Sequence, residues 1–457
     1  MRSLTSQPAF KTAALLTTVG LLLRLAVALQ GDPMAPYFAA SDTAWYMAMG
    51  EGLFSGVEVG ISRAGLQYVN SAYGIPPLFV IFVGLWQKIA APDAATIGIR
   101  VSQCLLSVLT GLLTADAARR LTRSDRVGLI VLAVMMLDPS QILEPQHILT
   151  ETLYITLVTA GVWAYLTWMV DVKALELRAA VGVGLLLGLA TLTRAVSVAY
   201  PLFVAAHLVW RWRGQRWRAG AAAGLLLLTY LVVTSTWTVY NVVVWDRFFY
   251  VSDQFLPAVW RGATTEDSDP FTNDALLLRD AEPDPTCGGD CTPRITLDLY
   301  AQQALRLITS DLPAYLGLRL TELVESILQP HAATNLPGES LRALAMAWVD
   351  SGLSLDRFVR LINGDFFWLK LTIYVFQYVG YGLMIVGLWR LRPRWALALV
   401  PLSFIAYTIS IHVVLLALPR YIFPVMPMVW MLAGGALMPR VRLHGESRPA
   451  AAPALRA

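Results

Sequence analysis

The chain has 457 residues, of which 56% are hydrophobic and only 14% are charged. Soluble domains carry about 25% charged residues, so this composition and several apolar runs of about 20 residues exclude an ordinary soluble protein and indicate a polytopic helical membrane protein. The net charge of +4 is too small to indicate nucleic-acid binding, and the arginines gather in short loops, where they report membrane orientation.

The first apolar run is predicted to be a retained transmembrane helix. Arg2 and Lys11 give the positive start that a signal peptide would also have. The run Ala13–Leu29 is long enough to span a bilayer, however, and many further spans follow it. Arg24 within this run and Asp138 in a later one are candidates to pair inside the bundle.

Arginine-rich loops orient the other helices. Five such loops are expected in the cytoplasm with the N-terminus, at 118–126, 171–178, 211–218, 390–394 and 440–448. Ten transmembrane helices satisfy all of them, at about 13–30, 97–117, 127–144, 151–170, 179–193, 196–210, 219–245, 366–389, 395–417 and 421–438. Both termini are then cytoplasmic.

Two segments are expected on the outer side. The first outer loop, 31–95, contains Pro76–Ala90, which is short, opens with two prolines and is predicted to be an interfacial helix. If it spanned the membrane, the arginine-rich loop 118–126 would lie outside. The second segment, 246–365, is acidic at first and then reads "SDLPAYLGLRLTELVESILQ", a helix with a Ser/Asp capping signal.

The predicted fold class is therefore an all-α polytopic integral membrane protein. Residues 1–245 form a transmembrane module, 246–365 the outer segment, 366–440 the last three transmembrane helices, and 441–457 a Pro/Ala-rich disordered tail. The sequence has no P-loop or dinucleotide-binding glycine motif. Internal repeats of the transporter kind are not evident.

Three cysteines are present. Cys104 lies in an apolar run and is expected to be a packing residue. Cys287 and Cys291 form "CGGDC", which predicts a small disulfide if this segment faces an oxidising compartment. A metal site is less favoured, because no second Cys or His pair lies nearby.

Ionisable residues at the membrane boundary are the candidate functional residues, because they are costly in a bilayer. Asp42, Glu151, Arg194 and Arg420 come from four distant segments, and the predicted topology places all four on the outer side. Each also has a simpler interpretation, as a helix cap, a helix-dipole partner or a snorkelling arginine. Their convergence favours a site for a phosphate-bearing lipid, since an acid can deprotonate a hydroxyl and guanidinium groups can hold a phosphate.

Aromatic and histidine side chains accompany these charges. Trp45 and Tyr46 are candidates to stack on a sugar, or else belong to an interfacial aromatic belt. His147 lies four residues before Glu151 and is expected to share a helix face with it. Glu51 is interpreted as a charge on the surface of a helix.

On these motifs the chain resembles the GT-C class of integral-membrane glycosyltransferases, in particular the branch with the protein O-mannosyltransferases and the lipid A aminoarabinose transferase. The segments that carry the resemblance are "SDTAWYMAMGEGLFSG", "YGIPPLFVIFVGLW", "LDPSQILEPQHILTETLYI", "GLLLGLATLTRA" and "LPRYIFPVMP". Each is short, but their order agrees with the predicted topology.

The resemblance implies a reaction in which a sugar moves from a polyprenyl-phosphate carrier to an acceptor hydroxyl on the outer face, usually with inversion. Asp42 matches the catalytic base of the family, and Glu151 best matches its second acid. Arg420 and Tyr421 match the side that holds the carrier phosphate, with Arg194 assisting. Trp45, Tyr46 and His147 are then the candidates to bind sugar or acceptor.

The sequence also departs from the family pattern. Relatives often carry a second acid where Thr43 stands, and a lysine before the prolines of the interfacial helix is missing, so Arg63 is the candidate cation in its place. Some relatives use a divalent cation and others do not. The implied location is a bacterial inner membrane with a periplasmic active site, and the implied partners are the lipid-linked sugar donor, a glycan, lipid or protein acceptor, and membrane lipids, but no nucleic acid.

Three other classes of function remain open on the sequence. A flippase or transporter for lipid-linked sugars predicts charges near the bilayer midplane and internal symmetry. A polysaccharide polymerase or ligase predicts key Arg and His residues in the large outer segment, where His331 lies. A membrane scaffold gives the four candidate charges no reason to converge.

Overall fold

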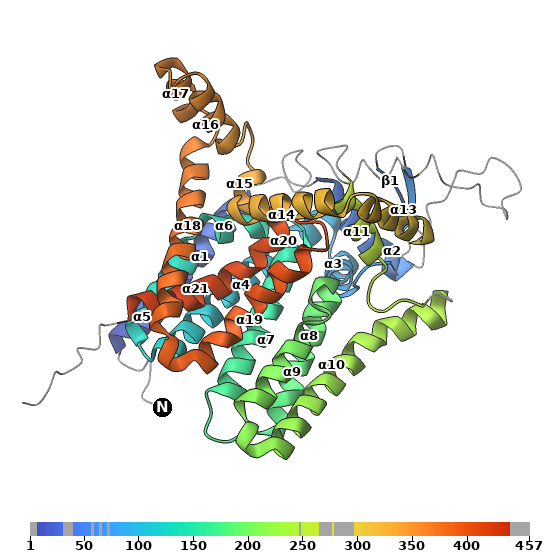
Figure 1. Cartoon of the computed structure of the whole chain (residues 1–457), viewed down its shortest axis with the longest axis vertical. Helices are drawn as coiled ribbons and strands as arrows, with labels where there is room; N and C mark the ends of the chain where they lie inside the picture. The colour runs from blue at the N-terminus through green and yellow to red at the C-terminus, as the bar shows by residue number, and fades with distance from the viewer. Residues whose placement is uncertain are drawn as a thin grey trace, which may run out of the picture.

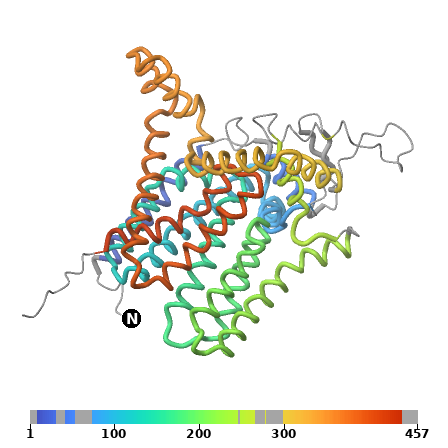
Figure 2. The backbone as a smooth tube through the Cα atoms, in the orientation of Figure 1, coloured from blue at the N-terminus to red at the C-terminus, as the bar shows by residue number. Residues whose placement is uncertain are grey.

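The computed structural model describes residues 7–30, 40–55, 59–63, 66–70, 74–245, 248–264, 277 and 297–438. Long helices form a bundle, and a layer of shorter helices lies across one of its ends, which is the upper end in Figures 1 and 2. The first described residues lie at the opposite end.

The bundle contains every segment predicted to span. Its helices are α1 (Gln7–Ala28), α4 (Pro92–Thr122), α5 (Asp125–Leu137), α7 (Thr150–Tyr165), α8 (Leu177–Thr193), α9 (Tyr200–Arg211), α10 (Arg216–Trp245), α18 (Phe367–Arg390), α19 (Trp395–His412), α20 (Pro419–Ile422) and α21 (Met426–Ala433). Seven described helices are long and apolar enough to cross a membrane, or eight if α5 and the bent segment Pro139–Gln146 count as one span. The prediction of a helical polytopic membrane protein is confirmed.

Some boundaries differ from the prediction. Leu177–Thr193 and Ala195–Arg211 are apolar but shorter than the other spans. The last predicted helix is broken into α20, a 3₁₀ turn at Phe423–Val425, and α21, because Pro424 and Pro427 remove helical N–H donors. The break places the short helix α20, with Arg420, at the edge of the bundle.

The layer at the upper end is built from shorter elements. They are α2 (Ala40–Ser55), β1 (Val59–Arg63), β2 (Leu66–Asn70), α3 (Leu78–Ile89), α11 (Phe255–Ala263), α13 (Leu297–Ser310), α14 (Leu312–Leu328) and α15 (His331–Thr334). Two further helices, α16 (Leu341–Asp350) and α17 (Leu355–Ile362), project beyond it from the end of α18. The sequence did not predict the antiparallel hairpin, in which Val59 pairs with Asn70 and Arg63 with Leu66.

Two predictions about this layer can be compared with the structure. Helix α3 has 12 residues, which at about 1.5 Å per residue is too short to cross about 30 Å of hydrocarbon. It packs against α2 and α4. Its length and these contacts agree with the predicted interfacial helix. The predicted cap of α14 is confirmed, since the Asp311 side chain accepts a hydrogen bond from the Ala314 amide.

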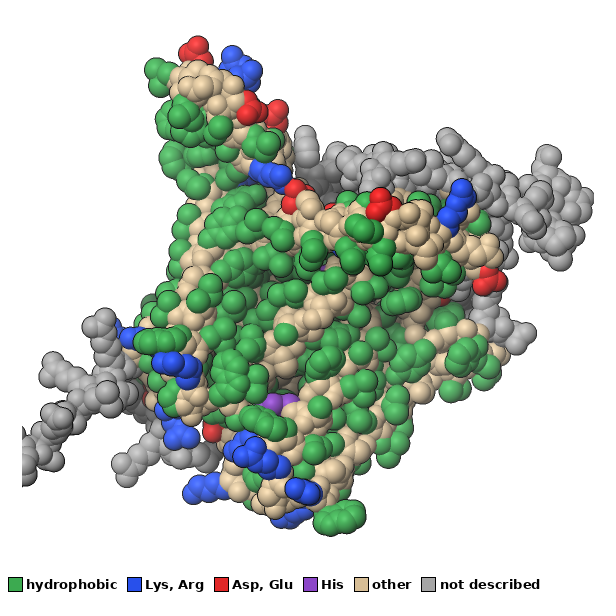
Figure 3. All heavy atoms as spheres, in the orientation of Figure 1, with side chains coloured by type: hydrophobic (Ala, Val, Ile, Leu, Met, Phe, Trp, Pro, Cys, Tyr) green, Lys and Arg blue, Asp and Glu red, His purple; other side chains and the backbone are tan. Residues whose placement is uncertain are grey.

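Charged side chains are separated between the ends of the molecule. In Figure 3 most Lys and Arg side chains gather at the end opposite the short-helix layer, and a broad hydrophobic belt lies between the ends. This distribution agrees with positive-inside reasoning, which would put the short-helix layer on the outer side. The orientation itself stays a prediction.

Helix α18 crosses α21 closely at Gly387. A Cβ atom built on Gly387 would lie 2.0 Å from the Leu432 carbonyl oxygen. Small residues permit such close approach of helices in a membrane, where packing replaces the hydrophobic effect between helices. This crossing holds α21 and the turn before it against α18.

Arg24 anchors α1 to the bundle through partners that the sequence left open. Its side chain is fully buried and donates hydrogen bonds to the carbonyl oxygens of Gly20, Met135 and Met136 and to Ser107 Oγ, at 2.9–3.1 Å. The Asp138 carboxylate accepts from the Ser140 amide. Arg24 therefore satisfies carbonyls at the end of α5 that lack helical partners.

We expect Arg24→Met to destabilise the protein without touching the candidate site. The substitution leaves buried carbonyl groups unsatisfied, at a cost of about 2–4 kcal/mol for the set. Thermal unfolding in detergent should show a clearly lower midpoint for Arg24→Met. The control is Lys11→Met on the exposed face of the same helix, which should leave the midpoint unchanged. Equal midpoints for the two variants would contradict this role of Arg24.

Candidate active site

The four predicted charges meet where the bundle joins the short-helix layer. Asp42 lies in the first turn of α2, Glu151 in the first turn of α7, Arg194 at the residue that ends α8, and Arg420 in α20. Asp42 thus occupies a helical position and not the cap. The ends of four elements, distant in sequence, bring these side chains to one place.

The charges form an alternating chain of ion pairs. Arg420 Nη1 lies 2.6 Å from Asp42 Oδ2, and Arg420 Nε lies 3.7 Å from Glu151 Oε1. Arg194 Nη1 lies 2.5 Å from the same Glu151 oxygen. Arg420 therefore bridges two carboxylates and is the centre of the cluster. The two carboxylates and the two guanidinium groups have equal and opposite charge, which lowers the free-energy cost of burying them.

Exposure divides the cluster into an accessible and an inaccessible part. The side chain of Glu151 is 1% exposed, whereas those of Asp42 and Arg420 are 10% and 22% exposed. Glu151 also accepts a hydrogen bond from the Thr150 hydroxyl at 3.2 Å and lies at a helix N-terminus, which favours a negative charge. Glu151 is thus the buried carboxylate that contacts both arginines, and Asp42 and Arg420 are more exposed than Glu151.

Aromatic rings fix the orientation of the arginines. The Tyr421 ring lies 5.1 Å from the Arg194 guanidinium and 5.3 Å from that of Arg420. The Tyr154 ring lies 5.7 Å from the Arg194 guanidinium. Tyr421 in turn stacks on His412, with ring centroids 5.6 Å apart. Cation–π contacts of this kind orient a guanidinium without using its N–H donors.

Trp45 and Tyr46 follow Asp42 on α2. The Tyr46 ring packs edge-on against Phe79 of α3, with ring centroids 5.0 Å apart. The centroids of the Trp45 and Tyr46 rings are 5.9 Å apart. Burial raises the pKa of Tyr46 well above its ordinary value, and the nearby carboxylate of Asp42 adds to the shift. The phenol therefore stays protonated beside the ion-pair cluster.

The expectation that His147 shares a helix face with Glu151 is wrong. Helix α7 begins only at Thr150, and His147 has an extended backbone, with φ −83° and ψ 129°. Its side chain is 2% exposed and faces Glu144 and Asn335. The short 3₁₀ turn that ends at Gln146 redirects the chain, so helical spacing does not apply across it.

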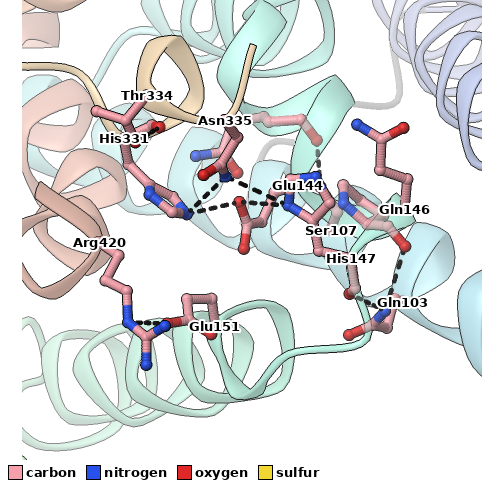
Figure 4. Close-up of polar contacts among 12 residues, drawn as sticks. Gln103, Ser107, Glu144, Gln146, His147, Glu151, His331, Thr334, Asn335 and Arg420 are labelled. Atoms are coloured by element: carbon pink, nitrogen blue, oxygen red, sulfur yellow. Dashed lines mark hydrogen bonds and ion pairs between the residues drawn. The ribbon is translucent and has the colours of Figure 1, made fainter. Parts of the chain in front are cut away.

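His147 instead belongs to a second buried group, which we call the Glu144 cluster: Glu144, His147, His331 and Asn335 (Figure 4). Glu144 Oε2 lies 3.2 Å from His331 Nε2 and 3.8 Å from His147 Nδ1. The Asn335 amide nitrogen lies 3.5 Å from a ring nitrogen of each histidine. Figure 4 draws this cluster beside the Arg420–Glu151 pair.

The sequence interpretation missed Glu144. The signal available was "EPQH", an acid three residues before a histidine within an apolar segment, which is costly unless it is used or paired. His331 comes from α15, nearly two hundred residues later, and its contact with Glu144 depends on how the outer segment folds back. Only the tertiary structure shows that contact.

Several predicted residues lie apart from these two clusters or outside the described part of the chain. The backbone of Arg63 is in β1, but its side chain is outside the described residues, as are Cys287 and Cys291. Cys104 is buried and unpaired with another cysteine, as a packing residue would be. Glu51 is exposed on α2. Within the described residues, no group of three or more His, Cys, Asp or Glu is arranged to hold a metal ion.

The structure is a helical membrane bundle with a layer of short helices across one end and a buried ionic cluster beneath that layer. Residues 81–251 match the model of the dolichyl-phosphate-mannose-protein mannosyltransferase family. The predicted resemblance is thereby confirmed over that segment. No curated protein matches the chain.

Two solved structures of one enzyme share the fold. The oligosaccharyltransferase of Archaeoglobus fulgidus, tethered to an acceptor peptide, matches with a TM-score of 0.51 and 10% identity over 94% of this chain. The same enzyme with zinc and sulfate matches with a TM-score of 0.50 and 12% identity over 93% of this chain. This chain spans about half the length of that enzyme, 49% and 48% in the two matches. ArnT from Cupriavidus metallidurans, bound to undecaprenyl phosphate, has a TM-score of 0.38 at 14% identity, covering 93% of this chain and 77% of that one.

Proposed function

We propose that this protein is a membrane glycosyltransferase that moves a sugar from a polyprenyl-phosphate carrier to an acceptor hydroxyl on the outer face of the membrane. The observation that carries the proposal is the contact between Asp42 and Arg420, 2.6 Å apart and joined through Arg420 to Glu151. It puts a potential base and a phosphate-binding cation side by side. The family matched by residues 81–251, whose name includes a lipid-phosphate-linked mannose, supports this donor chemistry.

The proposed reaction is a single in-line displacement. Asp42 accepts the proton of the acceptor hydroxyl as its oxygen attacks the anomeric carbon. The bond between that carbon and the carrier phosphate breaks, and its electron pair goes to the phosphate oxygen. Arg420 and Arg194 stabilise the charge that develops there. A single displacement inverts the anomeric configuration.

The remaining residues hold this machinery in place. Glu151 keeps both guanidinium groups oriented from within the protein, and Tyr421 lies between them. Trp45 and Tyr46, one turn beyond Asp42 on α2, are proposed to contact the sugar or the acceptor. Arg63 is proposed as a further cation for the phosphate, and Cys287 and Cys291 as a disulfide of the outer segment. The proposed location is a bacterial inner membrane with the site on the periplasmic face.

The positions of the charges favour an enzyme over a flippase. A flippase needs charges along a path through the membrane. Here Asp42, Glu151, Arg194 and Arg420 lie at helix ends, and the guanidinium of Arg24 inside the bundle is bonded to carbonyl groups and a serine. This arrangement suits a reaction at one membrane surface.

The test is sugar transfer by the purified protein in proteoliposomes. A panel of synthetic polyprenyl-phosphate sugars, beginning with the mannose donor and including a pentose donor, is mixed with short glycan, lipid and peptide acceptors, and the products are analysed by mass spectrometry. We expect one donor to give a glycosylated product and free polyprenyl phosphate in equal amounts. Movement of intact donor between leaflets without such products would support a flippase and contradict the proposal.

A further inference from the structure

The Glu144 cluster contains a carboxylate that is buried without hydrogen bonds. The side chain of Glu144 is 4% exposed, and neither of its oxygens accepts a hydrogen bond from any residue in the described part of the chain. Isolating an ionised carboxylate from water costs several kcal/mol or more. A proton-donating group beside the carboxylate offsets this cost, and the two histidines are the groups placed to supply it.

The two histidines of the cluster differ in pKa shift and in distance to Glu144. Burial lowers the pKa of His147 to about 4, an effect larger than the opposing attraction of Glu144, so His147 is neutral near pH 7. His331 Nε2 lies nearer to Glu144, at 3.2 Å against 3.8 Å for His147 Nδ1. His331 is therefore the histidine that lies closest to the Glu144 carboxylate.

His331 also borders a pocket on the side of the Arg420 helix. The pocket is lined by polar side chains of α14 and α18 and by residues of α20 and the following turn, including Ser326, Gln377, Tyr381, Pro419 and Phe423. The His331 ring packs against Phe423, with centroids 5.5 Å apart. His331 thus contacts the buried Glu144 and also lines a polar pocket next to the helix that carries the phosphate-binding arginine.

We propose that His331 is the proton donor to the carrier phosphate as it leaves the sugar, with Glu144 as the residue that positions it. This rests on the function proposed above. As the bond from the anomeric carbon to the phosphate oxygen breaks, the electron pair passes to the phosphate, and the His331 N–H proton moves to a phosphate oxygen. The products are a monoprotonated polyprenyl phosphate and neutral His331, which regains a proton from water. Asp42 separately holds the proton of the acceptor hydroxyl.

The surroundings suit this role. A phosphodiester that becomes a phosphomonoester gains one negative charge, and Arg420 and Arg194 already share their charges with Asp42 and Glu151. A proton delivered to the phosphate neutralises the added charge directly. The other ionisable groups that face His331 are His147, Glu151 and Tyr381, and only Glu144 lies within ion-pair distance of it among the described residues.

The experiment compares two donors in His331→Gln. One is the polyprenyl-phosphate sugar that the wild-type protein uses, and the other is its phosphorothioate, whose leaving group is less basic and needs a proton less. We expect His331→Gln to slow transfer from the phosphate donor by about 100-fold, within the usual range for general acid catalysis, and transfer from the phosphorothioate by no more than tenfold. His207→Gln, a histidine paired with Tyr165, is the matched control and should leave the ratio of the two donors unchanged.

Equal slowing of both donors by His331→Gln would assign His331 a packing role and overturn the inference, as would the absence of any slowing. Transfer by Glu144→Gln, measured with the same two donors, is a second test and decides the matter if His331→Gln does not fold. It keeps the shape of the side chain but no longer holds the proton, so the same selective loss with the phosphate donor is expected. If the wild-type protein transfers sugar from no donor, the proposed function itself fails. A failure of His331 alone is different, because the wild-type protein then transfers sugar and only the selective loss in the variants is missing.

Discussion

Asp42→Asn is expected to abolish sugar transfer, with a loss of about 10³-fold or more in rate, while donor binding persists. The asparagine keeps the size of the side chain and an oxygen that can accept the Arg420 hydrogen bond now made at 2.6 Å. It cannot accept a proton from the acceptor hydroxyl. Initial rates in proteoliposomes, together with the donor concentration at half-saturation, measure the two effects separately.

Glu51→Gln is the matched control for Asp42→Asn. Glu51 is an acid on the same helix, exposed and nine residues further along. Its neutralisation should leave both rate and half-saturation unchanged. Near-normal transfer by a folded Asp42→Asn protein would contradict the assignment of Asp42 as the base and indicate that another acid takes this role.

Arg420→Gln is expected to impair both donor binding and the chemical step. The substitution removes a guanidinium that contacts two carboxylates, and losing one such donor to a developing anion costs about 10²–10³-fold in rate. Arg420→Lys should recover only part of the loss, because a single ammonium group cannot reach both acids with the fixed fork of a guanidinium. Steady-state kinetics with the donor varied show whether half-saturation rises as the maximal rate falls.

The double variant Asp42→Asn/Arg420→Gln separates stability from catalysis. Arg420→Gln alone leaves a buried carboxylate without this partner, so its unfolding midpoint should fall. Neutralising Asp42 as well should restore part of the midpoint but none of the transfer. Arg178→Gln replaces an exposed arginine in the first turn of α8 that pairs with Glu176; it is the control and should change neither. An Arg420→Gln protein with normal half-saturation for the donor would contradict phosphate binding at this residue.

Much of the fold is predictable from the sequence because its signals are local. Apolar runs of spanning length mark the bundle helices, and the Asp311 cap marks the start of α14. Both depend on the cost of exposing backbone and apolar groups, which a single segment already encodes. Boundaries set by contacts elsewhere were missed, such as the broken helix at Pro424 and the hairpin between β1 and β2.

The candidate site divides in the same way. The sequence alone identified Asp42, Glu151, Arg194 and Arg420, because a charge next to an apolar run is costly and therefore conspicuous. It did not show that Arg420 contacts Asp42 across 378 residues of chain, and it placed His147 on the wrong element. Helical spacing relates residues within one helix only, and a 3₁₀ turn separates His147 from α7.

The sequence by itself thus determined the class of helical membrane protein and identified the candidate charges, because hydrophobicity and the cost of buried charge act residue by residue. The tertiary structure alone decided how those charges pair and that Glu144 and His331 meet beside them. Those contacts join helix ends and an outer segment from distant parts of the chain, and their geometry is set by the packing of the whole bundle. The proposed division of labour, with Asp42 taking one proton and His331 giving another, depends on that packing.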